Sequence, residues 1–247
     1  MDQFSRFELL VGSDALGRIK RSRVAVFGIG GVGGYVAEAL ARSGVGTLDI
    51  IDNDSVSLTN LNRQIIALHS TVGKSKVAVM KERILDINPD CTVNAFELFF
   101  GADTEDSFDF TQYDYVVDAI DTVTAKLRLI EKCTKLGVPV ISSMGTGNKL
   151  DPSGLEITDI SKTSYDGLAR IMRKELSKRG IKHLPVVYSA EQPVKPDREK
   201  LSELLDAEDL KKRTVPASSA FVPPCAGLML AAKVLSDLGG VSDGQGT

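Results

Sequence analysis

FGIGGVGGYVAEALARSGVG, residues 27–46, is the stretch that decides the predicted fold. A short apolar run, RVAVFG at residues 23–28, leads into it, and apolar residues at helical spacing occupy residues 32–43. A second apolar run, TLDIID, follows at residues 47–52. Strand, glycine turn, helix and strand in this order form a βαβ unit, which favours a parallel sheet with right-handed crossovers.

The rest of the chain continues the alternation of strands and helices. Apolar runs predict further strands at residues 92–98, 115–119, 138–143, 155–161 and 185–190. Helical spacing predicts a leader helix at residues 1–20 and helices at residues 74–88, 123–137 and 166–179. A C-terminal helix is expected within 221–238, after Pro223 and Pro224. The charged stretch 192–212 predicts a mobile loop or an exposed helix. We therefore predict an α/β fold: a doubly wound, Rossmann-like, mostly parallel sheet with an appended C-terminal α/β portion.

Composition excludes several classes of protein. The 247 residues carry 30 basic and 33 acidic side chains, a net charge of −3, so the chain is not a globally basic nucleic-acid binder. Cys91, Cys133 and Cys225 form no CxxC pair, which argues against a disulfide framework and a four-cysteine zinc site. His69 and His183 are too few for a histidine-rich metal centre. Without a signal peptide or an apolar run long enough for a membrane span, we expect a cytoplasmic protein.

The glycine turn predicts a nucleotide site. Gly28, Gly30 and Gly33 fit G-x-G-x-x-G between a strand and a helix, with Gly31 as a further glycine inside the turn. Glycines allow a phosphate to approach the backbone, and the helix N-terminus offers free N–H groups. Asp52 ends the second strand, where a carboxylate can accept hydrogen bonds from both ribose hydroxyls. These features suit NAD, FAD and ATP equally.

Polar residues downstream favour a triphosphate over a dinucleotide. Asp54, Asn60, Arg63 and Lys76 follow Asp52 within one stretch, and a dehydrogenase needs no such cluster. The planar Arg63 side chain can clamp phosphate, and Lys76 can neutralise charge on leaving pyrophosphate. Asp121 follows the YVVDA strand, at the sheet edge where ligands bind in doubly wound folds. Its carboxylate is the predicted ligand of Mg²⁺.

Four stretches resemble the ubiquitin-activating-type adenylyltransferase superfamily, which includes the activators of the molybdopterin and thiamine sulfur carriers. They are the glycine stretch already quoted, IIDNDSVSLTNLNRQ at 50–64, VGKSKV at 72–77 and VDAIDT at 117–122. The resemblance implies that the glycine turn binds ATP together with Asp52. It implies phosphate contacts by Asn60, Arg63 and Lys76, and a role for Asp121 at the Mg²⁺–ATP site. It also implies a homodimer in which Arg6, in the N-terminal helix, reaches the partner's site.

The sequence departs from two branches of that superfamily. It lacks the CxxC zinc pairs that the sulfur-carrier activators often carry. Residues 142–220 contain no cysteine, whereas ubiquitin-type activators place a catalytic cysteine after the adenylation core. Cys225 is the single late cysteine, and its position before a hydrophobic helix favours packing over catalysis.

The second half is similar to the tRNA threonylcarbamoyladenosine dehydratases. The matching stretches are ISKTSYDGLARIMRKELSKRGI at 160–181, PVVYSAEQP at 185–193 and SSAFVPPCAGL at 218–228. That family uses ATP to cyclise a modified adenosine beside the tRNA anticodon. Gly167 is a small departure, because the family is expected to carry proline there.

A basic segment supports an RNA substrate. Residues 162–182 hold seven basic and two acidic side chains, a local charge of +5 in an acidic chain. Such a stripe suits RNA phosphates, although a solvated helix face is the plain alternative. Tyr165 and Tyr188 are candidate stacking platforms for bases, with core packing equally open. The predicted tRNA contacts are Arg170, Arg173, Lys174, Lys178 and Arg179.

These features together predict one reaction and one division of the chain. We expect ATP-dependent dehydration of N6-threonylcarbamoyladenosine at position 37 of tRNA through an acyl-adenylate. We expect an ATP-binding adenylation core with the N-terminal helix in residues 1–145. Residues 146–238 would form the tRNA- or substrate-facing portion and C-terminal helix of the same domain, and 239–247 a flexible tail.

Partners and alternatives complete the expectation. ATP and Mg²⁺ are the expected cofactors, and a monovalent cation is a further candidate that loop carbonyls would hold. Expected partners are tRNA, a second copy of the chain, and cysteine-desulfurase or sulfur-acceptor proteins, with no DNA. The main alternative is activation of the C-terminal Gly-Gly of a ubiquitin-like or sulfur-carrier protein. A scaffold without chemistry and an NAD-dependent oxidoreductase are the remaining alternatives.

Overall fold

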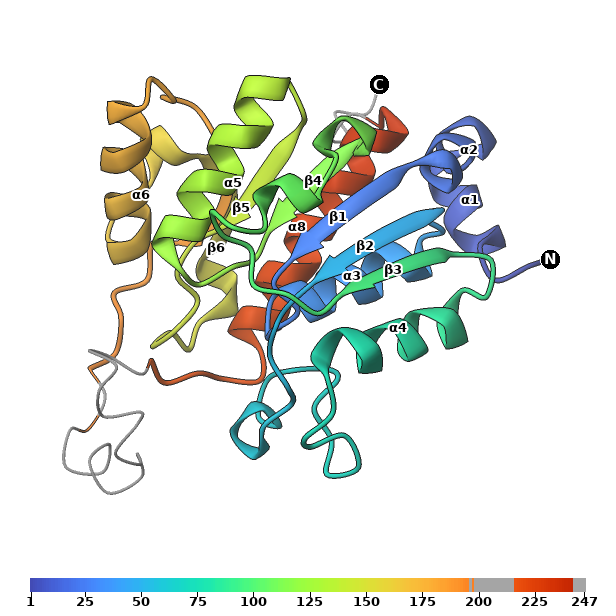
Figure 1. Ribbon diagram of the computed structural model, residues 1–247, viewed down its shortest axis with the longest axis horizontal. Helices are drawn as coiled ribbons and strands as arrows, with labels where there is room; N and C mark the ends of the chain where they lie inside the picture. Colours follow the sequence, from blue (N-terminus) through green and yellow to red (C-terminus); the bar gives the residue numbers. More distant parts are fainter. Residues whose placement is uncertain (196, 198–215, 242–247) are drawn as a thin grey trace.

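The computed structural model describes residues 1–195, 197 and 216–241. Seven strands form one sheet in the order β3-β2-β1-β4-β5-β7-β6 (Figure 1). Every neighbouring pair is parallel except β6 with β7, which confirms the predicted Rossmann-like, mostly parallel sheet. The strands are β1 (Arg23–Phe27), β2 (Thr47–Ile51), β3 (Thr92–Phe96), β4 (Tyr115–Asp118), β5 (Val140–Ser143), β6 (Leu155–Asp159) and β7 (Pro185–Ser189).

The sheet has a topological switch point between β1 and β4. The chain runs outward from β1 through β2 to β3 and then returns to lay β4 on the other side of β1. Loops leaving the carboxyl ends of β1 and β4 therefore run in opposite directions, and ligands bind at such a point in doubly wound sheets. Strands β7 and β6 extend the same sheet beyond β5, so the appended C-terminal portion continues the sheet and does not form a separate one.

Helices cover both faces of the sheet (Figure 1). Alternate strand residues face opposite sides, so Val24 and Val26 pack into one core and Ala25 and Phe27 into the other. The first core is completed by α2 (Ser13–Arg21), α3 (Gly33–Arg42), α4 (Lys76–Ile87) and α8 (Val222–Gly239). The second is completed by α5 (Val123–Leu136) and α6 (Gly167–Lys178). Among the described residues, none of these helices is long and apolar enough to cross a membrane.

Two helices differ from the sequence prediction. The leader is not one helix but two, α1 (Ser5–Val11) and α2, because Gly12 adopts φ +86° and breaks it. Pro223 and Pro224 lie inside α8 and do not precede it, since the first turn of a helix needs no intrahelical N–H donor. The predicted flexible tail and most of the charged 192–212 stretch lie outside the described residues.

A buried carboxylate joins α3 to α4. Glu38 accepts hydrogen bonds from Arg83 Nε at 2.6 Å and from Arg42 Nε at 2.7 Å. Burial raises the pKa of Glu38, but the hydrogen bonds from the two arginines outweigh it, so the pKa lies below its usual range. The cluster fixes the helix that begins at the glycine turn against the helix that begins at Lys76.

Candidate active site

The glycine turn packs against the end of β4. Gly28 has φ +89°, and a Cβ there would lie 2.6 Å from the Ala119 carbonyl oxygen. A Cβ at Gly33 would lie 1.8 Å from the Gly28 carbonyl oxygen. Both positions therefore require glycine, and α3 begins directly at Gly33. The turn presents its backbone at the N-terminus of a helix, where N–H groups favour an anion.

The turn also leaves space for a ligand. A Cβ on Gly30 would meet only Gln64 Nε2, at 3.8 Å. Gln64 is buried, and its side-chain oxygen has no hydrogen-bond partner among the described residues. A buried polar atom without a partner is rare in proteins and is expected where a polar ligand or water completes the site. Gly31 lies beside Arg63, because a Cβ there would be 3.2 Å from Arg63 Cγ.

Asp52, Asp54 and Lys76 meet beside the turn. Asp52 Oδ2 accepts a hydrogen bond from the Ile29 N–H at 2.6 Å, which fixes the carboxylate relative to the glycine turn. Lys76 Nζ lies 2.7 Å from Asp54 Oδ2 and 3.9 Å from Asp52 Oδ1. Burial raises the pKa of Asp52 above its usual value, and the nearby Lys76 charge opposes this shift.

Asn60 and Arg63 come from one turn between β2 and α4. Asn60 is buried at the end of η1 (Leu58–Asn60), and its side-chain oxygen accepts the Ser57 N–H at 3.1 Å. This gives Asn60 a structural role beside its predicted phosphate contact. Arg63 donates to Asn62 Oδ1 at 2.9 Å, and partial burial lowers the pKa of its guanidinium.

Asp121 lies exposed at the carboxyl edge of β4, above a fully buried ion pair. The Thr122 hydroxyl donates to its carboxylate at 3.2 Å, and no other hydrogen bond or ion pair of Asp121 is found within the described residues. Beneath it, Lys126 Nζ lies 2.9 Å from Asp118 Oδ2, and both side chains have no exposed surface. The described residues contain no cluster of three or more metal-ligating side chains. Asp121 therefore fits Mg²⁺ only as part of a ligand set made largely of phosphate oxygens and water, a mode this ion prefers.

Sequence reasoning missed Lys126, which ties two loops of the site together. Its ammonium donates to the Ile120 carbonyl at 3.1 Å and to the Ser143 carbonyl at 2.9 Å. The first carbonyl precedes Asp121 and the second ends β5. The available signal was a lysine among the apolar positions of α5, where its buried neighbours are Ala125 and Leu129.

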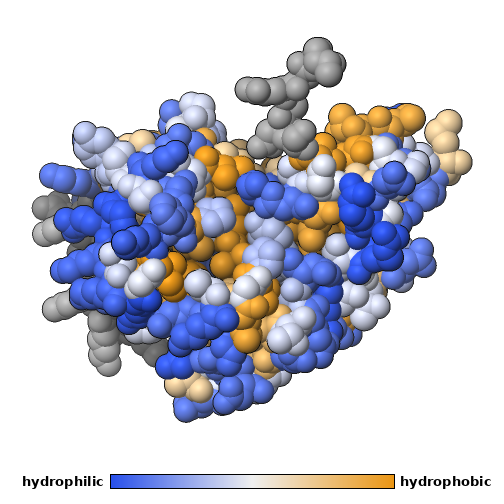
Figure 2. Space-filling model, turned by 90° about the horizontal axis from the view of Figure 1, so that it is seen from above, coloured by the Kyte–Doolittle hydropathy of each residue, from blue (hydrophilic) through white to orange (hydrophobic). Residues whose placement is uncertain are grey.

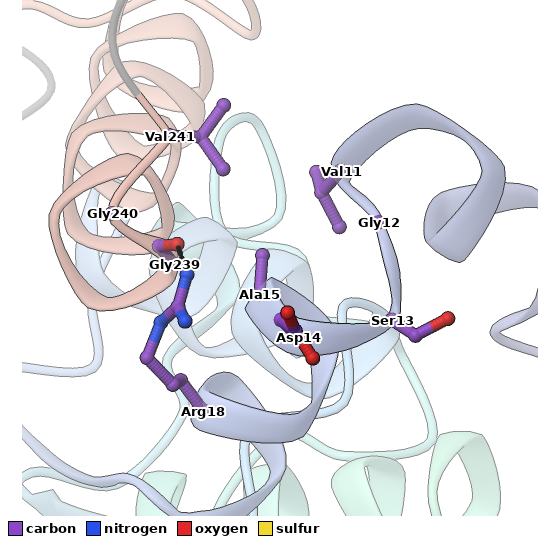
Figure 3. Close-up of a pocket in the computed structure, with 9 residues that line it drawn as sticks. All are labelled: Val11, Gly12, Ser13, Asp14, Ala15, Arg18, Gly239, Gly240 and Val241. Atoms are coloured by element: carbon purple, nitrogen blue, oxygen red, sulfur yellow. Dashed lines mark hydrogen bonds between the residues drawn. The ribbon is translucent and has the colours of Figure 1, made fainter.

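Arg6 lies away from these residues. It is exposed on α1, at the amino edge of the sheet, because α2 ends directly before β1. A hollow occupies the same edge, between the start of α2 and the end of α8 (Figure 3). Arg18 crosses this hollow to donate to the Gly239 carbonyl. The hollow is therefore separate from the candidate active site, and one chain alone does not bring Arg6 to its own glycine turn.

The basic residues of α6 are only partly available to a ligand. Arg170 and Lys174 are exposed and form no ion pair within the described part of the chain. The other three are engaged: Arg173 with Thr163, Lys178 with Glu175, and Arg179 with Glu175 and Glu131.

The candidate tyrosines and the cysteines differ in their exposure to solvent. Tyr188 is 3% exposed and belongs to the core, whereas Tyr165 is 71% exposed. Burial raises the pKa of the Cys91 thiol to about 11 and that of Cys133 to about 12, so neither suits a nucleophile. Cys225 packs against the first core from the first turn of α8, as expected of a packing residue.

Comparison with known proteins decides the family. The ThiF family model matches residues 4–235, which is most of the chain. The chain belongs to the ThiF family. The resemblance to ubiquitin-activating-type adenylyltransferases is thereby confirmed, and the relatives of this ThiF-family chain fall in the branch expected from its second half.

Two curated relatives carry the same name. The tRNA threonylcarbamoyladenosine dehydratase of Bacillus subtilis is 47% identical over 241 residues, covering 96% of this chain and 95% of that protein. The enzyme of that name from Haemophilus influenzae is 43% identical over 176 residues, covering 71% and 67%. Among solved structures, the Escherichia coli enzyme TcdA in complex with ATP superposes with a TM-score of 0.85 at 33% identity. The superposition covers 99% of this chain and 96% of the E. coli chain.

Proposed function

We propose that this protein catalyses the ATP-dependent dehydration of N6-threonylcarbamoyladenosine in tRNA, closing a ring on the modified base. One observation carries the proposal: the glycine turn, Asp52, Lys76 and Asp121 lie at one edge of the sheet, beside its switch point. The B. subtilis relative matches 96% of this chain in sequence, and the E. coli enzyme, solved in complex with ATP, shares the fold over 99% of it.

The chemistry requires activation of a carboxylate. A carboxylate is a poor electrophile because its leaving group would be oxide. Attack of the substrate carboxylate on the α-phosphorus of ATP releases pyrophosphate and gives an acyl-adenylate. The carbamoyl oxygen of the same substrate then attacks the activated carbonyl, the ring closes, and AMP leaves. Because the nucleophile is internal, proximity supplies much of the rate, and no catalytic cysteine is needed.

The residues divide this work. The glycine turn and the N-terminus of α3 hold phosphate, and Asp52 holds the ribose hydroxyls. Arg63 and Lys76 stabilise the negative charge that spreads onto the leaving pyrophosphate. Asp121 holds Mg²⁺, which supplies charge neutralisation at the phosphate oxygens when bound. Asn60, Asp54, Gly28, Gly30, Gly31 and Gly33 are the remaining proposed nucleotide-binding residues.

The RNA-facing surface is α6 with the turn before it. Arg170 and Lys174 supply free positive charge for tRNA phosphates, since both are exposed and unpaired within the described part of the chain. Arg173 acts differently: its guanidinium donates to Thr163 and thereby holds the turn before α6. Lys178 and Arg179 reach tRNA in this proposal only by leaving their carboxylate partners.

We further propose a homodimer that buries α1. Leu9 and Leu10 are 87% and 79% exposed, and an apolar patch marks the end of the molecule that carries α1 (Figure 2). Large exposed apolar side chains at one place typically mark an interface. Burying this helix against a second copy would carry Arg6 toward the partner's glycine turn, as the family resemblance implies. The cytoplasm follows from the proposed tRNA substrate. Sulfur-protein partners and a monovalent cation stay predictions.

The proposal is tested by the substrate dependence of AMP formation. Wild-type protein with Mg²⁺–ATP is incubated with tRNA that carries linear threonylcarbamoyladenosine, with the same tRNA lacking it, or with a carrier protein ending in Gly-Gly. The proposal expects AMP only with the modified tRNA, and none with Lys76→Ala. AMP formation driven by the carrier protein would favour the alternative of protein activation, which shares every ATP-site residue.

A further inference from the structure

Tyr165 combines exposure with an unusual backbone. Its side chain is 71% exposed, and its φ of +54° lies in the left-handed region. Bulky residues rarely adopt this region, because the side chain crowds the backbone, and such outliers concentrate at functional sites. Core packing does not account for the conformation, since most of the ring faces solvent.

The residues before Tyr165 are tied down. Arg173 Nη1 donates to the Thr163 carbonyl at 2.8 Å and to the Thr163 hydroxyl at 2.6 Å. The Thr163 hydroxyl also donates to the Ile160 carbonyl at 2.8 Å, and Thr163 is buried. The backbone before Tyr165 is therefore held at Thr163 by α6 and by the preceding turn.

The residue after Tyr165 is held more firmly. Asp166 Oδ1 accepts the Ala169 N–H at 2.8 Å and caps α6, while Asp166 Oδ2 lies 2.9 Å from Lys149 Nζ. The side chains of Asp166 and Lys149 are each only 2% exposed. The backbone of Tyr165 is therefore held between Thr163 and Asp166, and its ring extends into solvent.

This turn lies at the same sheet edge as the candidate active site. Lys149 also donates to the Ser189 carbonyl at 2.9 Å, and Ser189 ends β7. A Cβ on Gly145, which closely follows β5, would lie 3.0 Å from Asp166 Oδ2. Tyr165 is thus beside the carboxyl ends of β5 and β7, and the nucleotide site lies at the carboxyl ends of the adjoining parallel strands.

Free positive charge lies on the segments that flank Tyr165 in the chain. Lys162, Arg170 and Lys174 are exposed and form no ion pair within residues 1–195, 197 and 216–241. Arg170 lies one helical turn from Asp166, because its N–H donates to the Asp166 carbonyl at 3.0 Å. Helical side chains tilt toward the N-terminus, which directs Arg170 toward the Tyr165 end of α6. Two nearby acidic side chains are paired with basic ones: Asp166 with Lys149, and Glu175 with Lys178 and Arg179.

We propose that Tyr165 is a stacking platform for an unpaired base of the tRNA anticodon loop, with Lys162, Arg170 and Lys174 holding the flanking phosphates. The inference rests on the proposed tRNA substrate. Unpaired RNA bases stack on exposed aromatic rings, and phosphate contacts set the position of the strand. Removing one such ring weakens single-strand binding by about 5- to 150-fold.

Tryptophan fluorescence tests the platform directly, because the chain has no tryptophan. Tyr165→Trp introduces a single tryptophan, and Phe99→Trp is the matched control. Phe99 is 49% exposed and closely follows β3, at the other end of the sheet. Titration with tRNA carrying linear threonylcarbamoyladenosine is expected to quench Tyr165→Trp by base stacking and to leave Phe99→Trp unchanged. ATP alone is expected to quench neither.

Binding measurements supply the second readout. Tyr165→Ala is expected to weaken tRNA binding by about 5- to 150-fold, while Tyr165→Phe stays within about twofold of wild type because the ring remains. ATP binding and the unfolding temperature are expected to stay at wild-type values in both, since the ring is exposed. Wild-type tRNA affinity in Tyr165→Ala, or equal quenching in both tryptophan variants, would overturn the platform alone. A wild-type protein that binds no tRNA would overturn the proposed function as well.

Discussion

Lys126→Met removes one half of the most deeply buried ion pair in the site. Lys126 and Asp118 have no exposed side-chain surface, and their charged atoms lie 2.9 Å apart. Methionine keeps most of the side-chain length but leaves the Asp118 carboxylate with only the Ser142 hydroxyl, at 2.6 Å, and the Ile120 N–H, at 3.2 Å. Breaking a fully buried pair costs about 3–5 kcal/mol of unfolding free energy, because an uncompensated charge stays behind.

The loss of free energy can be measured by urea unfolding, and the lower unfolding temperature by thermal unfolding, both monitored by circular dichroism. For a chain of this size, each kcal/mol shifts the unfolding temperature by about 2–4 °C, so Lys126→Met is expected to lower it by about 6–20 °C. The double variant Asp118→Asn with Lys126→Met removes the stranded charge and is expected to be more stable than Lys126→Met alone. A single variant within about 1 kcal/mol of wild type would refute the reasoning. A double variant that loses the sum of both single losses would refute it too.

The double variant also separates folding from positioning. Lys126 holds the Ile120 and Ser143 carbonyls, so its loss releases the loop that carries Asp121. We expect a folded double variant to show a lower kcat for AMP formation with little change in KM for tRNA. An unchanged kcat would mean that the loop carrying Asp121 does not depend on the hydrogen bonds from Lys126 to the Ile120 and Ser143 carbonyls.

Three further predictions follow from single positions. Asp121→Ala is expected to abolish AMP formation while changing unfolding free energy by less than about 0.5 kcal/mol, because the side chain is exposed; normal turnover would sink the assignment. The pKa of Glu38 is lower in the folded protein than in the unfolded chain. Glu38 therefore stabilises the fold at pH values above its unfolded-state pKa, and this stabilisation is lost as the pH falls through its folded-state pKa. Glu38→Gln should therefore flatten the acid limb of a stability–pH profile, and an unaltered limb would contradict this. Gly167→Pro is expected to raise the free energy of unfolding by about 0.4–1 kcal/mol, because proline suits the first residue of a helix. Residue 167 is the first of α6, a Cβ there meets no atom within 4 Å, and Asp166 already has the ψ of 119° that a following proline requires. A lower unfolding temperature would show that the turn needs glycine.

Much of the fold was predictable because its signals are local. The apolar runs and the glycine turn predicted the parallel sheet, and six of its seven strands pair in parallel with at least one neighbour. The break at Gly12 was not predicted, since one exposed glycine with φ +86° leaves no mark on apolar spacing. The prediction that α8 begins after Pro223 and Pro224 was wrong, because the first turn of a helix tolerates proline.

The sequence predicted which residues form the candidate site better than it predicted the long-range contacts that hold them. Asp52, Asp54 and Lys76 meet as their order suggested, but long-range contacts such as Lys126 with Ser143 depend on packing that no motif encodes. Arg173 illustrates the same point. Its place in the basic segment 162–182 predicted an RNA contact, which stays a prediction, but not the hydrogen bond that its guanidinium donates to Thr163.

The most direct measurement is mass spectrometry of nucleosides from tRNA that carries linear threonylcarbamoyladenosine, after incubation with this protein and Mg²⁺–ATP. Work-up must avoid amines and base, which would reopen the ring. The proposal predicts loss of one water from that nucleoside with formation of AMP, and neither change with Lys76→Ala. An unchanged nucleoside in the presence of a protein that binds both ATP and tRNA would contradict the proposed dehydration.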